Sequence, residues 1–115
     1  MNMYPDTMTV YRHSIAGNAD EYSRRVISGV YWVETDGVDK EGKGFTKTRE
    51  VTVTTSQKLT ASYGKEWDIQ GQDRIIKGEG GSINSFKDIP DAFVVTAVSK
   101  YRCGGKVDNI VIKGV

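Results

Sequence analysis

The sequence predicts an all-β protein, a small antiparallel barrel of about six strands with long polar loops. β-Branched residues dominate the apolar set, with one Leu against 13 Val, nine Ile and ten Thr. Such residues are stiff at χ1 and pack well on a pleated surface. Several short runs alternate apolar and polar residues, and the 13 glycines supply turns between them. A length of 115 residues fits one domain, spanning residues 1–115.

Six segments have β-rich or alternating sequence and are expected to be strands: residues 7–12, 24–34, 47–55, 73–77, 92–101 and 106–113. Polar, glycine-containing segments between them are expected to be loops: residues 14–21, 36–44 and 78–90. The simplest connection of these strands is an antiparallel meander. Large apolar residues on both faces of 24–34 and 92–101 favour central strands and a closed barrel.

Single residues refine this prediction. Gly29, in the middle of its strand, predicts a bulge or sharp bend. Val51 and Val53 are expected to point inward. The pair Gly104–Gly105 predicts the turn of the last hairpin.

Helix is expected in at most one or two turns. In residues 56–72, Leu59, Tyr63 and Trp67 lie four apart, as on one helical face, but Gly64 interrupts the pattern. Ser85 and Asp88 have capping-box spacing, which favours one helical turn ending at Pro90.

Charge and composition restrict the function classes. The chain has 16 Lys and Arg against 15 Asp and Glu, a net charge of +1, without the basic excess typical of nucleic-acid-binding domains. Cys103, the single cysteine, excludes an internal disulfide and indicates a reducing compartment. No secretory signal is visible, and no apolar run approaches the ~20 residues of a membrane helix. We expect a protein with no membrane association.

Residues for catalysis are scarce. His13 is the single histidine, and it could in principle activate Ser14 or Cys103 as a nucleophile. The favoured interpretation is instead an exposed histidine side chain at a strand end. Asp36, Asp39 and Glu41 lack calcium-loop spacing. The glycines of residues 78–82 lack the Walker pattern and are expected to be a flexible connection into the following loop. We therefore expect no enzyme activity, no metal and no cofactor.

Binding of nucleic acid is the alternative function. The aromatics Tyr31, Trp32, Trp67, Phe93 and Tyr101 could form a stacking platform, as in an OB-like or SH3-like module. Each lies within an apolar run, which favours core packing instead. Lys100, Arg102, Lys106 and Lys113, with Asp108 beside them, form a modest basic set.

The order of elements in the second half, DRIIKGEG, FKDIPDAFVVTAVSKYRCGG and KVDNIVIKG, together with VISGVYW earlier, resembles the minor capsid or head-closure (stopper) proteins of long-tailed phages. The resemblance covers residues 10–114 and consists of the order of the elements and the general character of their sequences. One departure is Gln72, where the family pattern leads us to expect Gly before the acidic residue.

The resemblance implies a head–tail connector, a virion structural protein of a phage or prophage. Its subunits would be monomers or weak oligomers alone and form a ring between the portal or adaptor and the tail-terminator or tail proteins. They would assemble in the bacterial cytoplasm, reside at the head–tail junction and touch duplex DNA transiently. We expect two polar loops to bind partners or line the channel, through Asp36, Asp39, Lys40, Glu41, Lys43, Ser82, Asn84 and Lys87. Lys100, Arg102 and Lys106 are the expected DNA-facing tip.

Overall fold

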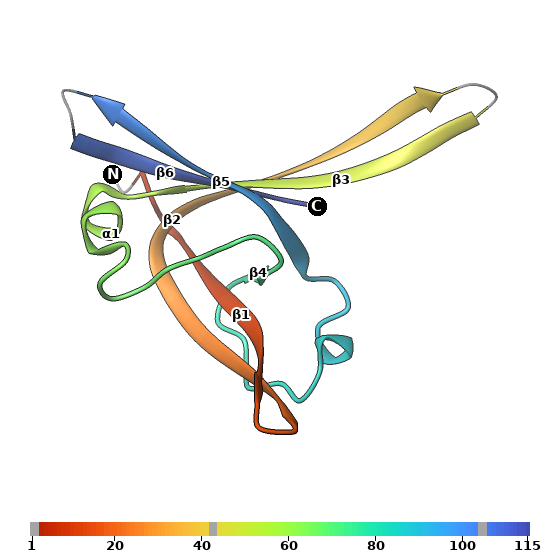
Figure 1. Ribbon diagram of the computed structural model, residues 1–115. Helices are drawn as coiled ribbons and strands as arrows, with labels where there is room; N and C mark the ends of the chain where they lie inside the picture. The colour runs from red at the N-terminus through yellow and green to blue at the C-terminus, as the bar shows by residue number, and fades with distance from the viewer. Residues whose placement is uncertain (1–2, 42–43, 104–105) are drawn as a thin grey trace.

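The computed structural model describes residues 3–41, 44–103 and 106–115, and it is all-β with two short helical turns (Figure 1). Six strands form one closed antiparallel barrel: β1 (Asp6–Ala16), β2 (Ala19–Glu41), β3 (Gly44–Thr55), β4 (Arg74–Lys77), β5 (Phe93–Cys103) and β6 (Lys106–Gly114). Helix α1 (Gln57–Ser62) follows β3, and the 3₁₀ helix η1 (Phe86–Asp88) precedes β5. The predicted fold class is confirmed.

The strands close in the order β1-β2-β3-β6-β5-β4, so the predicted meander is wrong in one connection. β3 pairs with β6, not with β4, and the chain between β3 and β4 crosses the barrel through α1. β4 fills the remaining gap between β1 and β5, pairing with β5 only at Arg74 and Ile75. A polar segment that ends in a four-residue strand has too little sequence pattern to predict which strands it pairs with.

Gly29 is the corner of the barrel, as predicted. β2 pairs with β1 up to Val30 and with β3 from Val30 onward, and the register skips Gly29, which has a φ of +88°. Its carbonyl accepts a hydrogen bond from Ser56 N at 2.9 Å, and an added Cβ would lie 3.0 Å from Ser56 Oγ. Glycine suits this position because it adopts positive φ without strain.

The bulge also reverses the faces of β2. Before Gly29 the odd-numbered Ile27 points inward, and after it the even-numbered Val30 and Trp32 do. The outer face consequently exposes Val26, Tyr31 and Val33, although the apolar residues on both faces had predicted burial on both sides. The two-sided apolar pattern reflects the bulge, since one extra residue shifts all later side chains to the other face.

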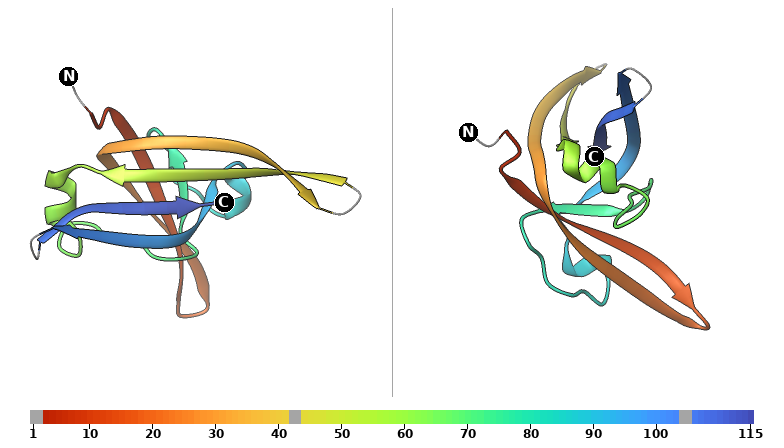
Figure 2. Two further views of the ribbon diagram at one scale, coloured as in Figure 1. Left: turned by 90° about the horizontal axis from the view of Figure 1, so that it is seen from above. Right: turned by 90° about the vertical axis from the view of Figure 1, so that its left-hand side faces the viewer.

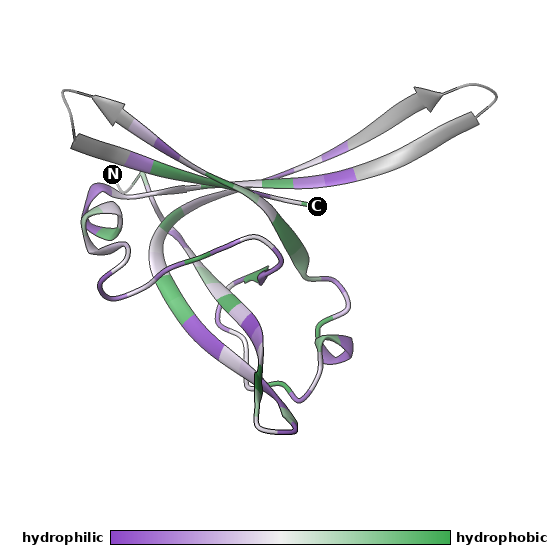
Figure 3. Ribbon diagram, in the orientation of Figure 1, coloured by the Kyte–Doolittle hydropathy of each residue, from purple (hydrophilic) through white to green (hydrophobic). Residues whose placement is uncertain are grey.

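The core fills the barrel interior, where the strands carry their hydrophobic residues (Figure 3). Val51 and Val53 are fully buried, as predicted. The other buried members of the core come from the remaining five strands and from the crossing segment: Met8, Val10, Ile27, Val30, Trp32, Trp67, Ile69, Ile75, Phe93, Val95, Ile110 and Ile112.

The two helical turns lie within the segments predicted for them. Ser56 caps α1 by accepting from Leu59 N, and Thr60 contacts Thr55 at 2.6 Å between hydroxyl oxygens. The helix ends at Ser62, while Tyr63 and Trp67 stack edge to face with ring centroids 4.9 Å apart. Leu59, Tyr63 and Trp67 therefore pack on the core without forming one continuous helix.

Two predicted loops are strands instead. Residues 14–21 form a tight hairpin in which Ala16 pairs with Ala19, and Gly17 takes a φ of +64° in the first central position of the turn. Residues 36–41 continue β2, which pairs with β3 as far as Glu41 and Gly44. Backbone hydrogen bonds hold both hairpins, so they need no apolar alternation, the signal on which the prediction depended.

Hairpins extend from the barrel on three sides (Figures 1 and 2). The radius of gyration is 15.6 Å and the extents are 47 × 40 × 27 Å. A compact chain of this length would have a radius of gyration of about 13 Å. The excess reflects paired strands that leave the barrel.

Candidate functional site

Two hairpin arms project in opposite directions from the sheet β2-β3-β6-β5 (Figure 2, left). The β2–β3 arm comprises residues 35–41 and 44–50, which pair only with each other because β3 meets β6 at Val51–Thr54. The β5–β6 arm comprises residues 100–103 and 106–109, beyond the part of β6 that pairs with β3. Its base rests on the barrel, because Ile110 is buried in the core and Asn109 Nδ2 donates to Thr55 O at 3.0 Å.

The arms carry most of the predicted site residues. Asp36, Asp39, Lys40 and Glu41 lie in β2 rather than in a loop, which corrects the prediction for this segment. Asp36 is exposed, the side chains of Asp39, Lys40 and Glu41 lie outside the described part of the structure, and Lys43 lies outside the described residues altogether. The structure therefore places the acidic set on a two-stranded arm.

The predicted basic tip lies on the other arm. Lys100 and Arg102 belong to β5 and Lys106 to β6, with Cys103 paired to Lys106 as the predicted last hairpin requires. Gly104 and Gly105 lie outside the described residues, as do the side chains of Arg102 and Lys106. The Lys100 ammonium lies 5.0 Å from the centroid of the Tyr63 ring, so this lysine already contacts its own chain.

The glycine-rich start of the third polar segment is fastened to the barrel, not flexible. Buried Thr9 donates from Oγ1 to Gly78 O at 2.7 Å and accepts from Gly80 N at 2.9 Å. Buried Tyr11 donates from its hydroxyl to Gly81 O at 2.8 Å. Burial raises the pKa of Tyr11, and the positive charge of Arg24 partly offsets that rise.

Ser82, Asn84 and Lys87 follow this anchor in a segment that is a loop, as predicted. Asn84 N donates to the Asp88 carboxylate at 2.9 Å, and Lys87 N donates to Ser85 Oγ at 3.2 Å. All three predicted residues are exposed. The capping contacts of η1 thus hold the backbone of Asn84 and Lys87 in place.

An aromatic cluster joins this loop to the β1–β2 hairpin. Tyr22 lies between His13 and Phe86, with ring centroids 4.9 and 5.0 Å away, and the Arg74 guanidinium lies 4.6 Å from the Phe86 centroid. His13 Nε2 lies 2.8 Å from the Asp20 carboxylate. His13 therefore contacts a carboxylate and an aromatic ring in the structure, not the hydroxyl of Ser14.

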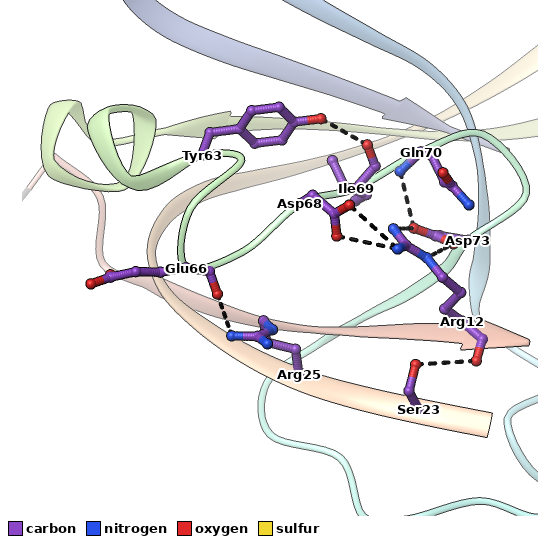
Figure 4. A network of polar contacts seen from close by, with 9 residues as sticks. All are labelled: Arg12, Ser23, Arg25, Tyr63, Glu66, Asp68, Ile69, Gln70 and Asp73. Carbon is purple, nitrogen blue, oxygen red and sulfur yellow. Dashed lines mark hydrogen bonds and ion pairs between the residues drawn. The ribbon is translucent and has the colours of Figure 1, made fainter. Parts of the chain in front are cut away.

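A polar network that sequence reasoning missed ties β1 to the crossing segment (Figure 4). Asp73, which is 3% exposed, accepts two hydrogen bonds from Arg12, from Nε at 3.0 Å and Nη2 at 2.8 Å, and a third from Gln70 N. Arg12 Nη1 also lies 3.2 Å from the exposed Asp68 carboxylate. The hydrogen bond to Asp73 is the main cause that raises the pKa of Arg12.

This network is structural. Asp73 O accepts from Val95 N at 2.8 Å, and Gln72 N donates to Val95 O at 2.9 Å, so the same turn holds β5. The turn needs a φ of +76° at Gln72, the one non-glycine residue with positive φ in the described chain. Glycine, which the family resemblance leads us to expect at this position, would take this conformation without strain.

Comparison with known protein families identifies one family whose model the chain matches. The model of a family of unknown function (DUF6751) matches residues 3–115. The chain belongs to this family. None of the curated proteins and none of the solved structures matches it.

This DUF6751 member exposes apolar side chains on the outer face of the sheet β2-β3-β6-β5. Trp32, Trp67 and Phe93 are buried as predicted, but Tyr31 and Tyr101 are 49% and 57% exposed, which corrects the prediction of core packing for these two. The bulge at Gly29 was predicted, but its consequence for the later residues of β2, which turns Tyr31 outward, was not.

The described residues of this DUF6751 member lack two other kinds of site. They contain no group of three or more His, Cys, Asp or Glu side chains placed to hold a metal ion. Among the same residues, no helix is long and apolar enough to cross a membrane.

Proposed function

We propose that this chain is a structural subunit of a phage head–tail connector, which forms a ring around the DNA channel between the portal or adaptor and the tail. The observation that carries the proposal is the pair of hairpin arms. An isolated two-stranded hairpin is marginally stable in water, so a protein that keeps two of them outside its barrel is suited to packing them against neighbours.

The small barrel supplies the rigid part of such a subunit. Its core residues are fully or nearly fully buried, and the loop after β4 is fastened by Thr9 and Tyr11. Partner contacts then fall on the arms and on the exposed side chains of Ser82, Asn84 and Lys87. A net charge of +1 fits a subunit that lets DNA pass without holding it, because each phosphate contact adds a salt-sensitive attraction.

Shortening the β2–β3 arm tests the proposal. Replacing residues 37–48 with Asn-Gly closes the hairpin directly after the pair Asp36 and Arg49, in a turn that suits strand twist. Arg49 stays because its guanidinium lies 3.8 Å from the Phe93 ring centroid. We expect the shortened protein to melt within a few degrees of the parent and to fail to join heads to tails in a phage lacking the native gene.

A matched control shortens the β1–β2 hairpin by the two residue pairs next to its turn, Ile15 with Asp20 and Ala16 with Ala19, and keeps Gly17–Asn18. Normal joining by the arm-shortened protein, at native expression and melting temperature, would refute the assignment of the arm.

The alternative function, an OB-like or SH3-like nucleic-acid module, is favoured by one observation, the exposure of Tyr31 and Tyr101. It predicts submicromolar binding of single-stranded DNA that is lost in Tyr31→Ala and Tyr101→Ala, because stacking contributes about 1–3 kcal/mol per base. The connector proposal predicts binding weaker than ~10 μM near physiological salt. Fluorescence anisotropy with a labelled oligonucleotide at two salt concentrations separates the two, with buried Trp32 left unchanged.

A further inference from the structure

Two segments of the sheet β2-β3-β6-β5 extend beyond the closed part of the barrel and have one edge without a strand partner among the described residues. On one side, β2 pairs with β1 only up to Val30. Trp32 N donates to the Asp6 carboxylate at 2.9 Å, and beyond it residues 33–41 have β3 as their one strand partner within the described chain.

The second open edge belongs to β5. β4 meets this strand only at Phe93 and Val94, and the turn before β4 binds the backbone of Val95 on both its N–H and its carbonyl. In the described residues 96–103, the backbone pairs with β6 and with no second strand. Ala97, Ser99 and Tyr101 are exposed there.

Open edges present unpaired N–H and C=O groups and readily accept another strand. All four strands of this sheet are antiparallel to their neighbours, so β2 and β5 run in opposite directions. When two copies stand side by side in the same orientation, β2 of one therefore meets β5 of the next antiparallel. The two open segments lie toward opposite ends of the sheet, so the second copy is also displaced along the strand direction to bring them together. Such a head-to-tail contact uses two different surfaces and can be repeated into a ring.

The charges of the two edges are complementary. Residues 33–41 contain four acids and one lysine, Glu34, Asp36, Asp39, Glu41 and Lys40. Residues 96–103 contain two basic residues, Lys100 and Arg102, and no acid. Pairing two copies through the same edge would place like charges opposite each other, which destabilises a strand pair, whereas β2 against β5 places opposite charges together.

We propose that residues 33–41 of one copy pair antiparallel with residues 96–103 of the next copy. The occupant of each open edge is thus a second copy of this chain. This inference deepens the ring formation in the proposed function and rests on that part of it. With the two segments centred on each other, Thr35 of one copy lies opposite Tyr101 of its neighbour.

Cross-linking between two single-cysteine proteins tests the contact. In the full-length chain with Cys103→Ser, one protein carries Thr35→Cys and the other Tyr101→Cys, both at exposed positions. Directly opposed residues in an antiparallel pair have Cα atoms about 4.5–5.5 Å apart, within the range that a disulfide bridges. The proteins are mixed in a glutathione redox buffer, in which oxidised glutathione takes up the two electrons from the thiols.

We expect the mixture to give at least about ten times more covalent dimer than either protein alone, since ten-fold corresponds to roughly 1.4 kcal/mol of preference. Val33→Cys in place of Thr35→Cys tests a strand register shifted by two residues, because the two side chains lie on the same face of β2. A ten-fold excess of covalent dimer between Val33→Cys and Tyr101→Cys also supports the proposal. Asp36→Cys is the matched control, because its side chain points to the opposite face of β2.

Two results would overturn the proposal. One is a mixture that cross-links no better than the Asp36→Cys control; the other is Tyr101→Cys dimerising alone as well as in the mixture. The test uses isolated protein and no phage. If the chain cross-links specifically but is absent from phage particles, the connector function is refuted and this contact is retained. If the chain is present in phage particles but does not cross-link specifically, this contact alone is refuted.

Discussion

Gly80 packs against the barrel so closely that adding one methyl group should destabilise the fold. A Cβ at this position would overlap the Tyr11 hydroxyl and lie 2.5 Å from Ile76 Cδ1. Tyr11 is fully buried, so its ring has no free space into which to move. Gly80 also donates to Thr9 and accepts from Arg24 Nη1 at 2.7 Å, which limits movement of the loop itself.

The expected magnitude follows from two contributions. Overpacking of a closely packed site costs about 1–3 kcal/mol. Displacing the Tyr11 hydroxyl also removes its hydrogen bond to Gly81 O, which contributes about 1 kcal/mol. Gly80→Ala should thus lower the free energy of unfolding by about 2–4 kcal/mol, or the melting temperature by roughly 8–15 °C.

Urea or thermal unfolding followed by circular dichroism measures this change. Gly81→Ala is the matched control, because an added Cβ there meets nothing within 4 Å, and its stability should stay within about 0.5 kcal/mol of the parent. Tyr11→Phe removes the overlapping hydroxyl and should partly rescue Gly80→Ala, giving a coupling energy of about 1 kcal/mol or more in a double-mutant cycle. Equal stability of the Gly80 and Gly81 variants would refute the close packing of this loop.

Three further predictions concern the same scaffold. Asp73→Asn should lower the free energy of unfolding by about 2–3 kcal/mol. This is less than the loss expected on breaking a fully buried ion pair, because Arg12 is partly exposed. Asp68→Asn, at the exposed end of the network, is the control and should change the free energy of unfolding by less than ~0.5 kcal/mol, as measured in urea. Because burial raises the pKa of Tyr11 above its ordinary value of 10.0, the neutral side chain stabilises the fold fully below pH 10 and this contribution is lost as the pH rises through the raised pKa. The stability difference between the parent and Tyr11→Phe should therefore shrink above pH 10, and a constant difference would contradict the assignment. Gln72→Gly should raise stability by up to ~1 kcal/mol by relieving left-handed strain, and a lower melting temperature would show that the turn is unstrained.

The sequence predicted the barrel because burial of β-branched residues leaves a local pattern. Val51 and Val53 alternate with polar residues along one strand and are both buried. Gly29, in the middle of the strand expected at residues 24–34, was predicted as a bulge or sharp bend from local sequence alone. Its effect on every later residue of β2, including the exposure of Tyr31, needed the register of two partners.

Features held by backbone bonding or by distant partners were not predictable in this way. Residues 36–41 are mostly polar and do not alternate, yet they extend β2 because the hairpin ladder is independent of side-chain hydropathy. Arg12 and Asp73 are 61 positions apart, and a pair at that separation has no periodicity to reveal it. The charged residues of the two arms were predicted as candidate site residues from the sequence. Their placement on two arms that project in opposite directions depends on the strand order, which the sequence did not predict.

The proposed place of the chain at the head–tail junction is tested most directly by locating it in purified particles. A phage expressing this protein with a short C-terminal tag would be labelled with gold-conjugated antibody and imaged by electron microscopy, with quantitative mass spectrometry of the same particles. The proposal predicts several copies per particle and gold at the head–tail junction. Particles of full infectivity that lack the protein, or gold confined to the head shell or the tail tip, would contradict it.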